Sequence, residues 1–465
     1  MSTAPLPPNE PSVAQPVPRR LSLVRQAVSR RTTARATNGV PTTVGLELGV
    51  PTVHRTVVDF GNLDHAATTP ALTAVSEAVD KVQRRYGSVH RGAGYTSRLT
   101  TSWFEQARDE VGSFVGARPD DEVVFTRNTT DSLRLLAHAL PRRTSVLVFE
   151  SAHHAALLPW PSRRTTRLPV PASAHDAVSL LDQALERLGD TGPRLVVLTG
   201  ACNVTGDIWP VAELAEVARR HGARTVLDAA QLAPHRVVDI AALGVDWVAF
   251  SGHKIYAPYG AGALVGRRDW LDQAAPYLPA GGATHTVSHR HIRWQQGPAR
   301  HEGGTPNAVG AIALATACAT IAANRDAVEA HEAELLGLLR AGLAATPGVH
   351  VHHVLGVSPD SVGVATFTVD GYAPSLVSQV LADEHGLAVR DGRFCAHLLC
   401  ETLFDGDGTA VRASIGLATT REHVQRLVSG VRRLVEQGPA LAYENTSEGW
   451  VAQDDPRDLT EPRPW

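Results

Sequence analysis

The chain has 465 residues, of which 43% are hydrophobic, and its formal net charge is −3. This length allows two domains with a sizeable core, and the charge does not favour a nucleic-acid partner. Its four cysteines form no C-x-x-C pair, no apolar run reaches the length of a membrane span, and the first residues lack the apolar core of a signal peptide. We therefore expect a cytoplasmic protein that binds no membrane.

The first forty residues are rich in Pro, Ser, Thr, Ala and Arg and carry six arginines against Glu10. They show no sustained period, so we expect a disordered basic extension over residues 1–45. This extension is either a solvated tail or an arm for an acidic partner. Order begins near Asn62, a helix is predicted from Pro70 to Tyr86, and the Gly-rich stretch 87–94 suits a loop at the mouth of a site.

Strand and helix patterns alternate through the next part of the chain. The predicted strands cover 122–126, 145–149, 194–198, 225–228 and 247–251, and the predicted helices cover 133–140, 174–188 and 211–221. Repeated β-α units predict a mostly parallel sheet with helices on both faces, in a large domain over 60–325. A smaller α+β domain over 326–437 and an acidic tail over 438–465 complete the α/β organisation.

Polar side chains follow the last two strands of this series. Asp228 and Gln231 follow the first strand, and Ser251, His253 and Lys254 follow the second. Ligands bind at the C-terminal ends of the strands of such sheets, so we expect these side chains to share one crevice. Taken one at a time, the same residues could also be a turn cap, a satisfied histidine and a strand-end charge.

Lysine is nearly absent from the chain. Only Lys81 and Lys254 occur, while the other strongly basic side chains are arginines. A desolvated amine loses its proton and attacks carbonyls, whereas a guanidinium stays charged. Lys81 lies in a polar helical pattern, so Lys254 is the predicted Schiff-base lysine.

Hydroxyl groups begin the predicted helix after strand 122–126. Thr129 and Thr130 would cap the helix and present its positive end to an anion. We therefore predict a phosphate cradle here, although capping alone would also explain both residues.

These motifs carry a family resemblance. The D-x-A-Q pattern at Asp228 and the S-x-H-K pattern at Lys254 resemble fold-type I pyridoxal-phosphate (PLP) enzymes of aminotransferase class V, and within them the group II cysteine desulfurase and selenocysteine lyase branch. The resemblance implies that fold, with PLP as cofactor. It also implies that Asp228 pairs with the pyridinium nitrogen, Gln231 with the ring hydroxyl, Ser251 and His253 with the phosphate, and Lys254 with the aldehyde.

Three further segments resemble the same branch. The stretch Ala152–Trp160 resembles E-H-H-x-N-x-x-P-W, which implies that His153 stacks on the cofactor ring. Asn203 matches the asparagine of an S-N-x-x-G segment, which implies a bond to the ring hydroxyl or the substrate carboxylate. Thr305 matches the threonine of F-E-x-G-T-P-N, which reaches the phosphate of the neighbouring subunit in relatives, so the resemblance implies a homodimer.

Residues 390–396 resemble the R-x-G-x-x-C-A motif, in which the cysteine lies on a short loop over the cofactor. The resemblance implies that Cys395 is the reacting thiol and Arg390 the motif arginine. Arg412 matches the substrate arginine, and a guanidinium fork suits an α-carboxylate. Relatives carry histidine where this chain has Phe394.

The implied function is a cysteine desulfurase-like reaction, in which sulfur leaves L-cysteine to give L-alanine and a persulfide on Cys395 for an acceptor protein. The alternatives are an aminotransferase of class V, an epimerase or a C–S lyase acting on another amino acid, and a non-catalytic PLP-binding or scaffold protein. A metal at His153 and His154 is not expected, because no carboxylate or cysteine stands at ligand spacing.

Overall fold

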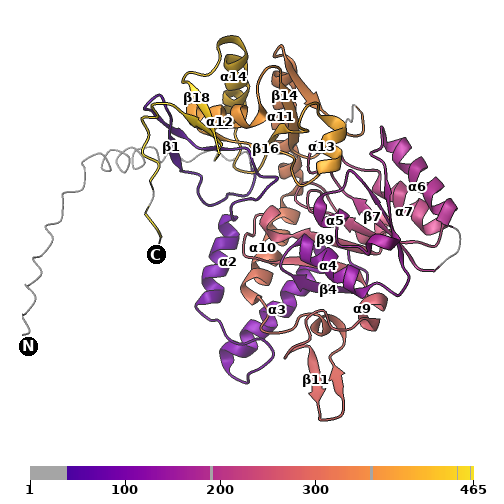
Figure 1. The fold of residues 1–465 in the computed structure, drawn as a ribbon. Coiled ribbons are helices and arrows are strands. Elements are labelled where there is room, and N and C mark those ends of the chain that lie inside the picture. Colours follow the sequence, from indigo (N-terminus) through magenta and orange to yellow (C-terminus); the bar gives the residue numbers. More distant parts are fainter. Residues whose placement is uncertain (1–38, 189–191, 357–359, 448, 461, 465) are drawn as a thin grey trace, which may run out of the picture.

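The structure, a computed structural model, describes residues 39–188, 192–356, 360–447, 449–460 and 462–464. Most of the predicted basic extension therefore lies outside the described residues. Figure 1 shows a larger body built around one sheet and a smaller body beside it.

The central sheet has seven strands, which in spatial order are β4 (Asp121–Thr126), β10 (Gly262–Arg267), β9 (Trp247–Ser251), β8 (Arg224–Asp228), β7 (Arg194–Thr199), β5 (Ser145–Phe149) and β6 (Thr165–Leu168). Only β10 runs antiparallel to its neighbours within this sheet. The predicted α/β fold with a mostly parallel sheet is confirmed. β6 and β10 are the two strands of this sheet that the β-α pattern does not predict.

Side chains along each strand alternate between two apolar cores, because successive residues of a strand point to opposite faces. Val226 and Ala249 belong to the core under one face, and Leu227 and Val248 belong to the core under the other. Because both faces of the sheet are covered, the sequences of these strands are continuous apolar runs. This is why the sequence predicts the parallel strands well.

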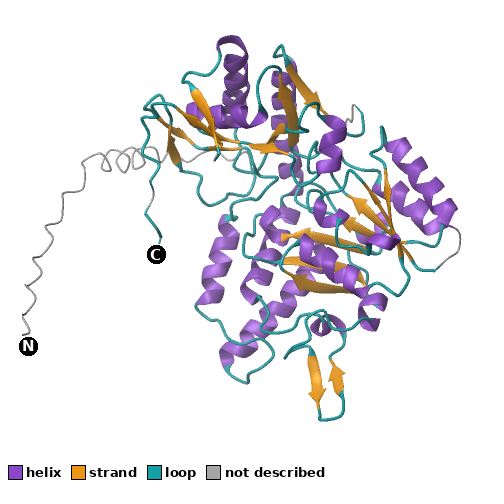
Figure 2. Cartoon of the chain, in the orientation of Figure 1, coloured by secondary structure: helices purple, strands orange, loops and turns teal. Residues whose placement is uncertain are grey.

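Helices cover both faces of the sheet (Figure 2). One core includes side chains of α4 (Thr129–Ala139), α5 (His154–Leu157) and α9 (Asp269–Gln273). The other includes side chains of α2 (Thr73–Gln83), α3 (Tyr95–Phe114), α6 (Ala174–Leu188), α7 (Val211–Arg220), α8 (Ile240–Leu243) and α10 (Ala308–Ala323). Single-turn 3-10 helices cover Ser162–Arg164, Gly252–Lys254 and Gly297–Arg300.

The smaller body is built on a four-stranded antiparallel sheet, in the order β13 (Val349–His352), β14 (Val364–Val369), β17 (Ala410–Ser414) and β16 (Arg390–Gly392). Its own core joins this sheet to α11 (Arg325–Ala344), α12 (Pro374–His385) and α14 (Arg421–Gln437). The short α13 (His397–Leu403) follows β16 and packs toward the larger body.

Both terminal segments pack on the smaller body. The hairpin of β1 (Gly49–Pro51) and β2 (Val57–Asp59) leads to β3 (Gly61–Asn62), which pairs in parallel with β15 (Leu387–Ala388). At the other end, β18 (Tyr443–Thr446) and β19 (Gly449–Ala452) form a hairpin against α12. The acidic tail is therefore in part a packed hairpin.

A further hairpin, β11 (Thr284–Val287) with β12 (Ile292–Trp294), projects from the larger body (Figure 1).

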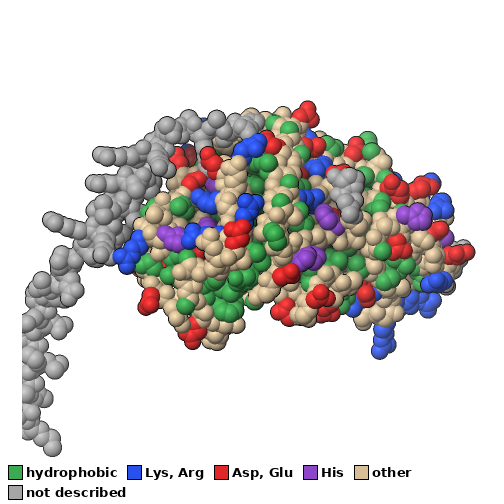
Figure 3. Space-filling model, turned by 90° about the horizontal axis from the view of Figure 1, so that it is seen from above, with side chains coloured by type: hydrophobic (Ala, Val, Ile, Leu, Met, Phe, Trp, Pro, Cys, Tyr) green, Lys and Arg blue, Asp and Glu red, His purple; other side chains and the backbone are tan. Residues whose placement is uncertain are grey.

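On the face shown in Figure 3, acidic and basic side chains are interspersed and do not gather by sign. Among the described residues no single helix has the length and apolarity of a membrane span. Helices α10 and α11 together have both, but they are bent by 77° relative to each other.

Candidate active site

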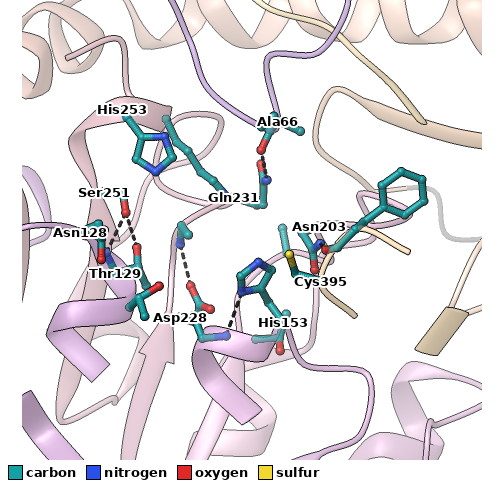
Figure 4. A pocket seen from close by; sticks show the side chains of 18 of the residues that line it. Ala66, Asn128, Thr129, His153, Asn203, Asp228, Gln231, Ser251, His253 and Cys395 are labelled. Atoms are coloured by element: carbon teal, nitrogen blue, oxygen red, sulfur yellow. Dashed lines mark hydrogen bonds between the residues drawn. The ribbon is translucent and has the colours of Figure 1, made fainter. Parts of the chain in front are cut away.

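A cavity of about 220 Å³ lies where the parallel strands end. It collects every predicted site residue except Thr305, although these residues come from both bodies of the chain. Its lining consists of Ala66, Ala67, Asn128, Thr129, Thr130, His153, Ala155, Thr199, Ala201, Asn203, Asp228, Ala230, Gln231, Ser251, His253, Lys254, Arg390, Phe394, Cys395 and Arg412. Figure 4 shows part of this lining.

Asp228 is the last residue of β8, and Lys254 lies in the turn directly after β9. Asp228 is 8% exposed, and its Oδ1 accepts a hydrogen bond of 3.0 Å from the amide of Ala230. Burial raises the pKa of Asp228. Burial also lowers the pKa of Lys254 to about 8, against the charge of Asp228, which raises it. A sizeable fraction of the amine is therefore unprotonated near neutral pH and is a competent nucleophile.

The start of α4 faces the same cavity. Asn128 caps the helix by accepting from the amide of Asp131 at 3.0 Å. The amide and the hydroxyl of Thr129 both lie 2.7 Å from Ser251 Oγ. Gly262 permits this close approach, since a Cβ there would lie 2.7 Å from the Cα of Asn128. A helix start presents backbone amides and the positive end of the helix dipole to an anion. The phosphate cradle at Thr129 and Thr130 stays a prediction.

His153 caps the short helix α5, and its Nδ1 accepts a bond of 3.0 Å from the amide of Ala155. Burial, and after it the charge of Lys254, lowers the pKa of His153 to about 3. The ring is therefore neutral at physiological pH, with its proton on Nε2, because Nδ1 is an acceptor here. Figure 4 shows the ring facing the cavity, where a flat neutral imidazole can stack on an aromatic ring.

Two side-chain amides of the site bind backbone carbonyls. Gln231 donates to Ala66 O at 2.8 Å, and Asn203 donates to Phe394 O at 2.7 Å. Each amide keeps an oxygen and a second N–H for other partners. Their structural effect is to tie two loops distant in sequence to the edge of the central sheet.

Arg412 lies on β17 and is 3% exposed. Its two terminal nitrogens donate to Asn203 O at 2.8 Å and to Asp64 Oδ1 at 3.1 Å. Burial raises the pKa of Asp64, and the neighbouring guanidinium opposes this. Arg390 stands opposite Arg412 in the register of β16 and β17 and lines the same cavity. The two arginines place positive charge where a carboxylate would bind.

Cys395 is the accessible thiol. It is exposed, whereas Cys202, Cys318 and Cys400 are buried. Burial raises the pKa of Cys400 to about 12 and raises that of the other two buried thiols as well. Deprotonated cysteine is the reactive form, so the three buried thiols are poor nucleophiles.

Thr305 is exposed and does not line the cavity of its own chain. Its loop is anchored next to Glu302, whose carboxylate accepts from Arg108 at 2.8 and 2.9 Å and from the amide of Phe125 at 2.7 Å. The expected role of Thr305 in a neighbouring subunit stays a prediction. No group of three His, Cys, Asp or Glu suited to a metal ion occurs among the described residues.

Several lining or bracing residues were not predicted from the sequence, among them Asn128, Asp64 and Phe394. Asn128 immediately precedes the predicted phosphate cradle and caps α4. Asparagine is a preferred residue at helix starts, and this preference was the signal in the sequence that could have identified it. Asp64 pairs with Arg412, but the two are 348 positions apart. Phe394 was noted only as a departure from relatives, and no local pattern shows that its ring faces Arg412.

Known proteins share this architecture. A family model described as aminotransferase class-V matches residues 62–427. A Vibrio cholerae protein named "Probable cysteine desulfurase" is 34% identical over 389 residues, which cover 80% of this chain and 93% of that protein. The protein of Mycobacterium leprae named "Probable cysteine desulfurase 2" is 36% identical over 391 residues, covering 80% of this chain and 91% of its own length.

Two solved structures give the same result. The apo structure of a cysteine desulfurase from Thermococcus onnurineus NA1 superposes with a TM-score of 0.73 at 31% identity, covering 81% of this chain and 95% of that one. The cysteine desulfurase CsdA from Escherichia coli superposes with a TM-score of 0.70 at 32% identity, covering 81% and 94%. From the family match over most of its length, this chain belongs to the aminotransferase class-V family.

Proposed function

We propose that this protein is a PLP-dependent cysteine desulfurase, which removes sulfur from L-cysteine and leaves L-alanine and a persulfide on Cys395. One observation carries the proposal: the cavity joins a buried amine of lowered pKa, Lys254, to a buried carboxylate, Asp228, and an exposed thiol, Cys395. Relatives of 34% and 36% identity that bear the name cysteine desulfurase support it.

The donor set of the cavity fits the cofactor. Lys254 would attach to its aldehyde, Asp228 would face its ring nitrogen, and His153 would stack on its ring. The phosphate would sit at the start of α4, and the polar groups available to the phosphate and the ring hydroxyl are Thr129, Thr130, Asn203, Gln231, Ser251 and His253. Bound PLP supplies an electron sink for negative charge on the substrate α-carbon.

The protein side chains would then handle the substrate. Arg412, with Arg390 beside it, binds the α-carboxylate and so orients the bonds at the α-carbon. Lys254 takes the α-proton, and its pKa of about 8 places it near the operating pH of such a base. The neutral ring of His153 adds no positive charge beside Lys254.

Cys395 would perform the sulfur transfer. Its thiolate attacks the substrate sulfur, so that an S–S bond forms while the Cβ–S bond breaks. The electron pair of the broken bond passes to the carbon skeleton, which takes up a proton at the β-carbon, regains the α-proton and leaves as alanine. The persulfide then lies on an exposed residue, where an acceptor protein can reach it.

We also propose a cytoplasmic homodimer in which Thr305 completes the phosphate site of the neighbouring subunit. Its exposure and its absence from the cavity of its own chain suit that role. The division into a large domain over 60–325 and a smaller one over 326–437 is part of the same proposal, with β3 paired to β15 of the smaller body.

The test is Cys395→Ala beside the control Cys400→Ala, which removes a buried thiol of the same region. With L-cysteine as substrate, we expect Cys395→Ala to lose alanine and persulfide formation while it keeps the absorbance of bound cofactor. Cys400→Ala should keep both. Full alanine production by Cys395→Ala would refute the desulfurase mechanism, and sulfide with pyruvate as the products would indicate a C–S lyase instead.

A further inference from the structure

Phe394 contacts one of the two groups that would act on the substrate and adjoins the other in the chain. It directly precedes Cys395 in the chain, and its ring centroid lies 5.1 Å from Cζ of Arg412. The Phe394 side chain is 5% exposed, while Cys395 is exposed. A guanidinium over an aromatic face is attracted by the ring quadrupole, and this attraction is stronger when the pair is desolvated.

Asn203 joins the same two elements by hydrogen bonds. Its backbone oxygen accepts from Arg412 at 2.8 Å, and its side-chain nitrogen donates to Phe394 O at 2.7 Å. Arg412, Asn203 and Phe394 therefore form a closed set of contacts between β17, the segment after β7 and the loop before α13. A displacement of Phe394 would therefore change its contacts with both Arg412 and Asn203.

The backbone at the thiol is held in a rare conformation. Phe394 has a φ of 48° and Cys395 a φ of 54°, and no other two consecutive non-glycine residues of the described chain have positive φ. Such residues cost free energy and persist only where their surroundings hold them. Here the surroundings include the bond from Asn203 to Phe394 O and a bond of 2.8 Å from the amide of His154 to Cys395 O.

We propose that Phe394 is a positioning residue that couples the carboxylate grip of Arg412 to the placement of the Cys395 thiol. The proposal rests on the proposed function and adds a residue to it. The ring covers one face of the guanidinium, so a carboxylate must approach in the guanidinium plane, where it accepts two parallel bonds. The same ring anchors the loop that presents the thiol, so one side chain serves both binding and transfer.

The experiment compares Phe394→Leu, which removes the ring, with Phe394→Tyr, which retains it. Phe404→Leu is the matched control, because Phe404 is 6% exposed in the same core and contacts His352. Four quantities are measured: kcat for L-cysteine, KM for L-cysteine, the affinity of the holoenzyme for L-alanine, and the rate of Cys395 alkylation by iodoacetamide in protein with and without cofactor.

For Phe394→Leu we expect KM to rise and the affinity for L-alanine to fall by the same factor, about tenfold. The kcat should fall as well, and the alkylation rate of Cys395 should change in both forms of the protein. Phe394→Tyr should restore all four quantities to within about twofold of the wild type. Phe404→Leu should lower the melting temperature like Phe394→Leu but leave the four quantities unchanged.

The proposal is overturned if Phe394→Leu leaves KM, L-alanine affinity and alkylation rate at wild-type values, or if Phe404→Leu changes them equally. A wild-type protein that makes no alanine from L-cysteine would refute the proposed function instead. In that case the alkylation rate still decides whether Phe394 places the thiol, since it requires neither substrate nor turnover.

Discussion

The carboxylate of Asp228 and the amine of Lys254 reach one cavity from the ends of two adjacent parallel strands. Both are buried, and each alters the ionisation of the other. The charge of Lys254 lowers the pKa of Asp228, and the charge of Asp228 raises the pKa of Lys254. Burial outweighs the second effect and lowers the pKa of Lys254 to about 8. The balance leaves an amine that exchanges its proton close to neutral pH. This relationship gives the first prediction.

Asp228→Asn should lower the pKa of Lys254, because it removes the charge that opposes the effect of burial. In the apoprotein, the rate at which added PLP becomes fixed by borohydride should rise with pH through an inflection near 8 in the wild type. The inflection should lie at lower pH in Asp228→Asn. Lys254→Arg should give no adduct at all, and an unchanged or higher inflection in Asp228→Asn would contradict the electrostatic argument.

Arg412→Lys should weaken the productive binding of amino-acid substrates. A lysine amine keeps the charge but cannot make the two parallel bonds of a guanidinium, and bonds to charged groups are worth about 1.5–3 kcal/mol each. We expect kcat/KM for L-cysteine to fall by roughly 10- to 100-fold. Arg421→Lys, at an exposed ion pair with Glu334, serves as the control and should leave kcat/KM unchanged.

His65 should make the fold sensitive to acid. Burial lowers its pKa from 6.5 to about 4, so between these two values the unfolded chain binds more protons than the folded one. Its contribution to stability is complete above pH 6.5, falls as the pH decreases, and is fully lost below about pH 4. The loss in the free energy of unfolding is about 3 kcal/mol, because each pKa unit corresponds to about 1.36 kcal/mol.

The measurement for His65 is the free energy of unfolding by urea at several pH values. His65→Gln, which cannot gain this proton, should show a smaller decrease between pH 6.5 and pH 4 than the wild type. Equal decreases in the two proteins would mean that His65 is not the titrating group.

Arg457→Ala should destabilise the smaller body without altering the site. The Arg457 side chain is 7% exposed, and its guanidinium lies 2.7 Å from the side chain of Asp383, which is 5% exposed. Removing one partner leaves a buried charge uncompensated, which costs about 3–5 kcal/mol. Unfolding by urea should show this loss, while Arg219→Ala, at an exposed pair with Glu216, should change stability by less than about 0.5 kcal/mol.

The strands around Asp228 and Lys254 were predictable because local composition carries the information. A strand buried on both faces must be apolar throughout, and polar residues directly after it mark the edge where ligands bind. The scarcity of lysine singled out Lys254 without any structure. The hydroxyl pair Thr129 and Thr130 was visible for the same reason, since helix starts favour such residues.

Pairings between distant segments were not predictable. β3 joins β15 across more than three hundred residues, and the C-terminal hairpin docks on α12. Nothing in the local pattern of β10 shows that it runs against its neighbours. Such contacts depend on the packing of whole elements, which no short window of sequence contains.

The sequence by itself determined the α/β fold, the order of its elements and the residue types gathered at the strand ends, because each of these follows from local apolar patterns and from side-chain chemistry. Tertiary structure alone decided that Cys395 is exposed while the other cysteines are buried, that Lys254 has a lowered pKa, and that Phe394 lies over Arg412. Burial, electric field and ring contact depend on distances between segments far apart in the chain, and those distances exist only once the two bodies have packed together.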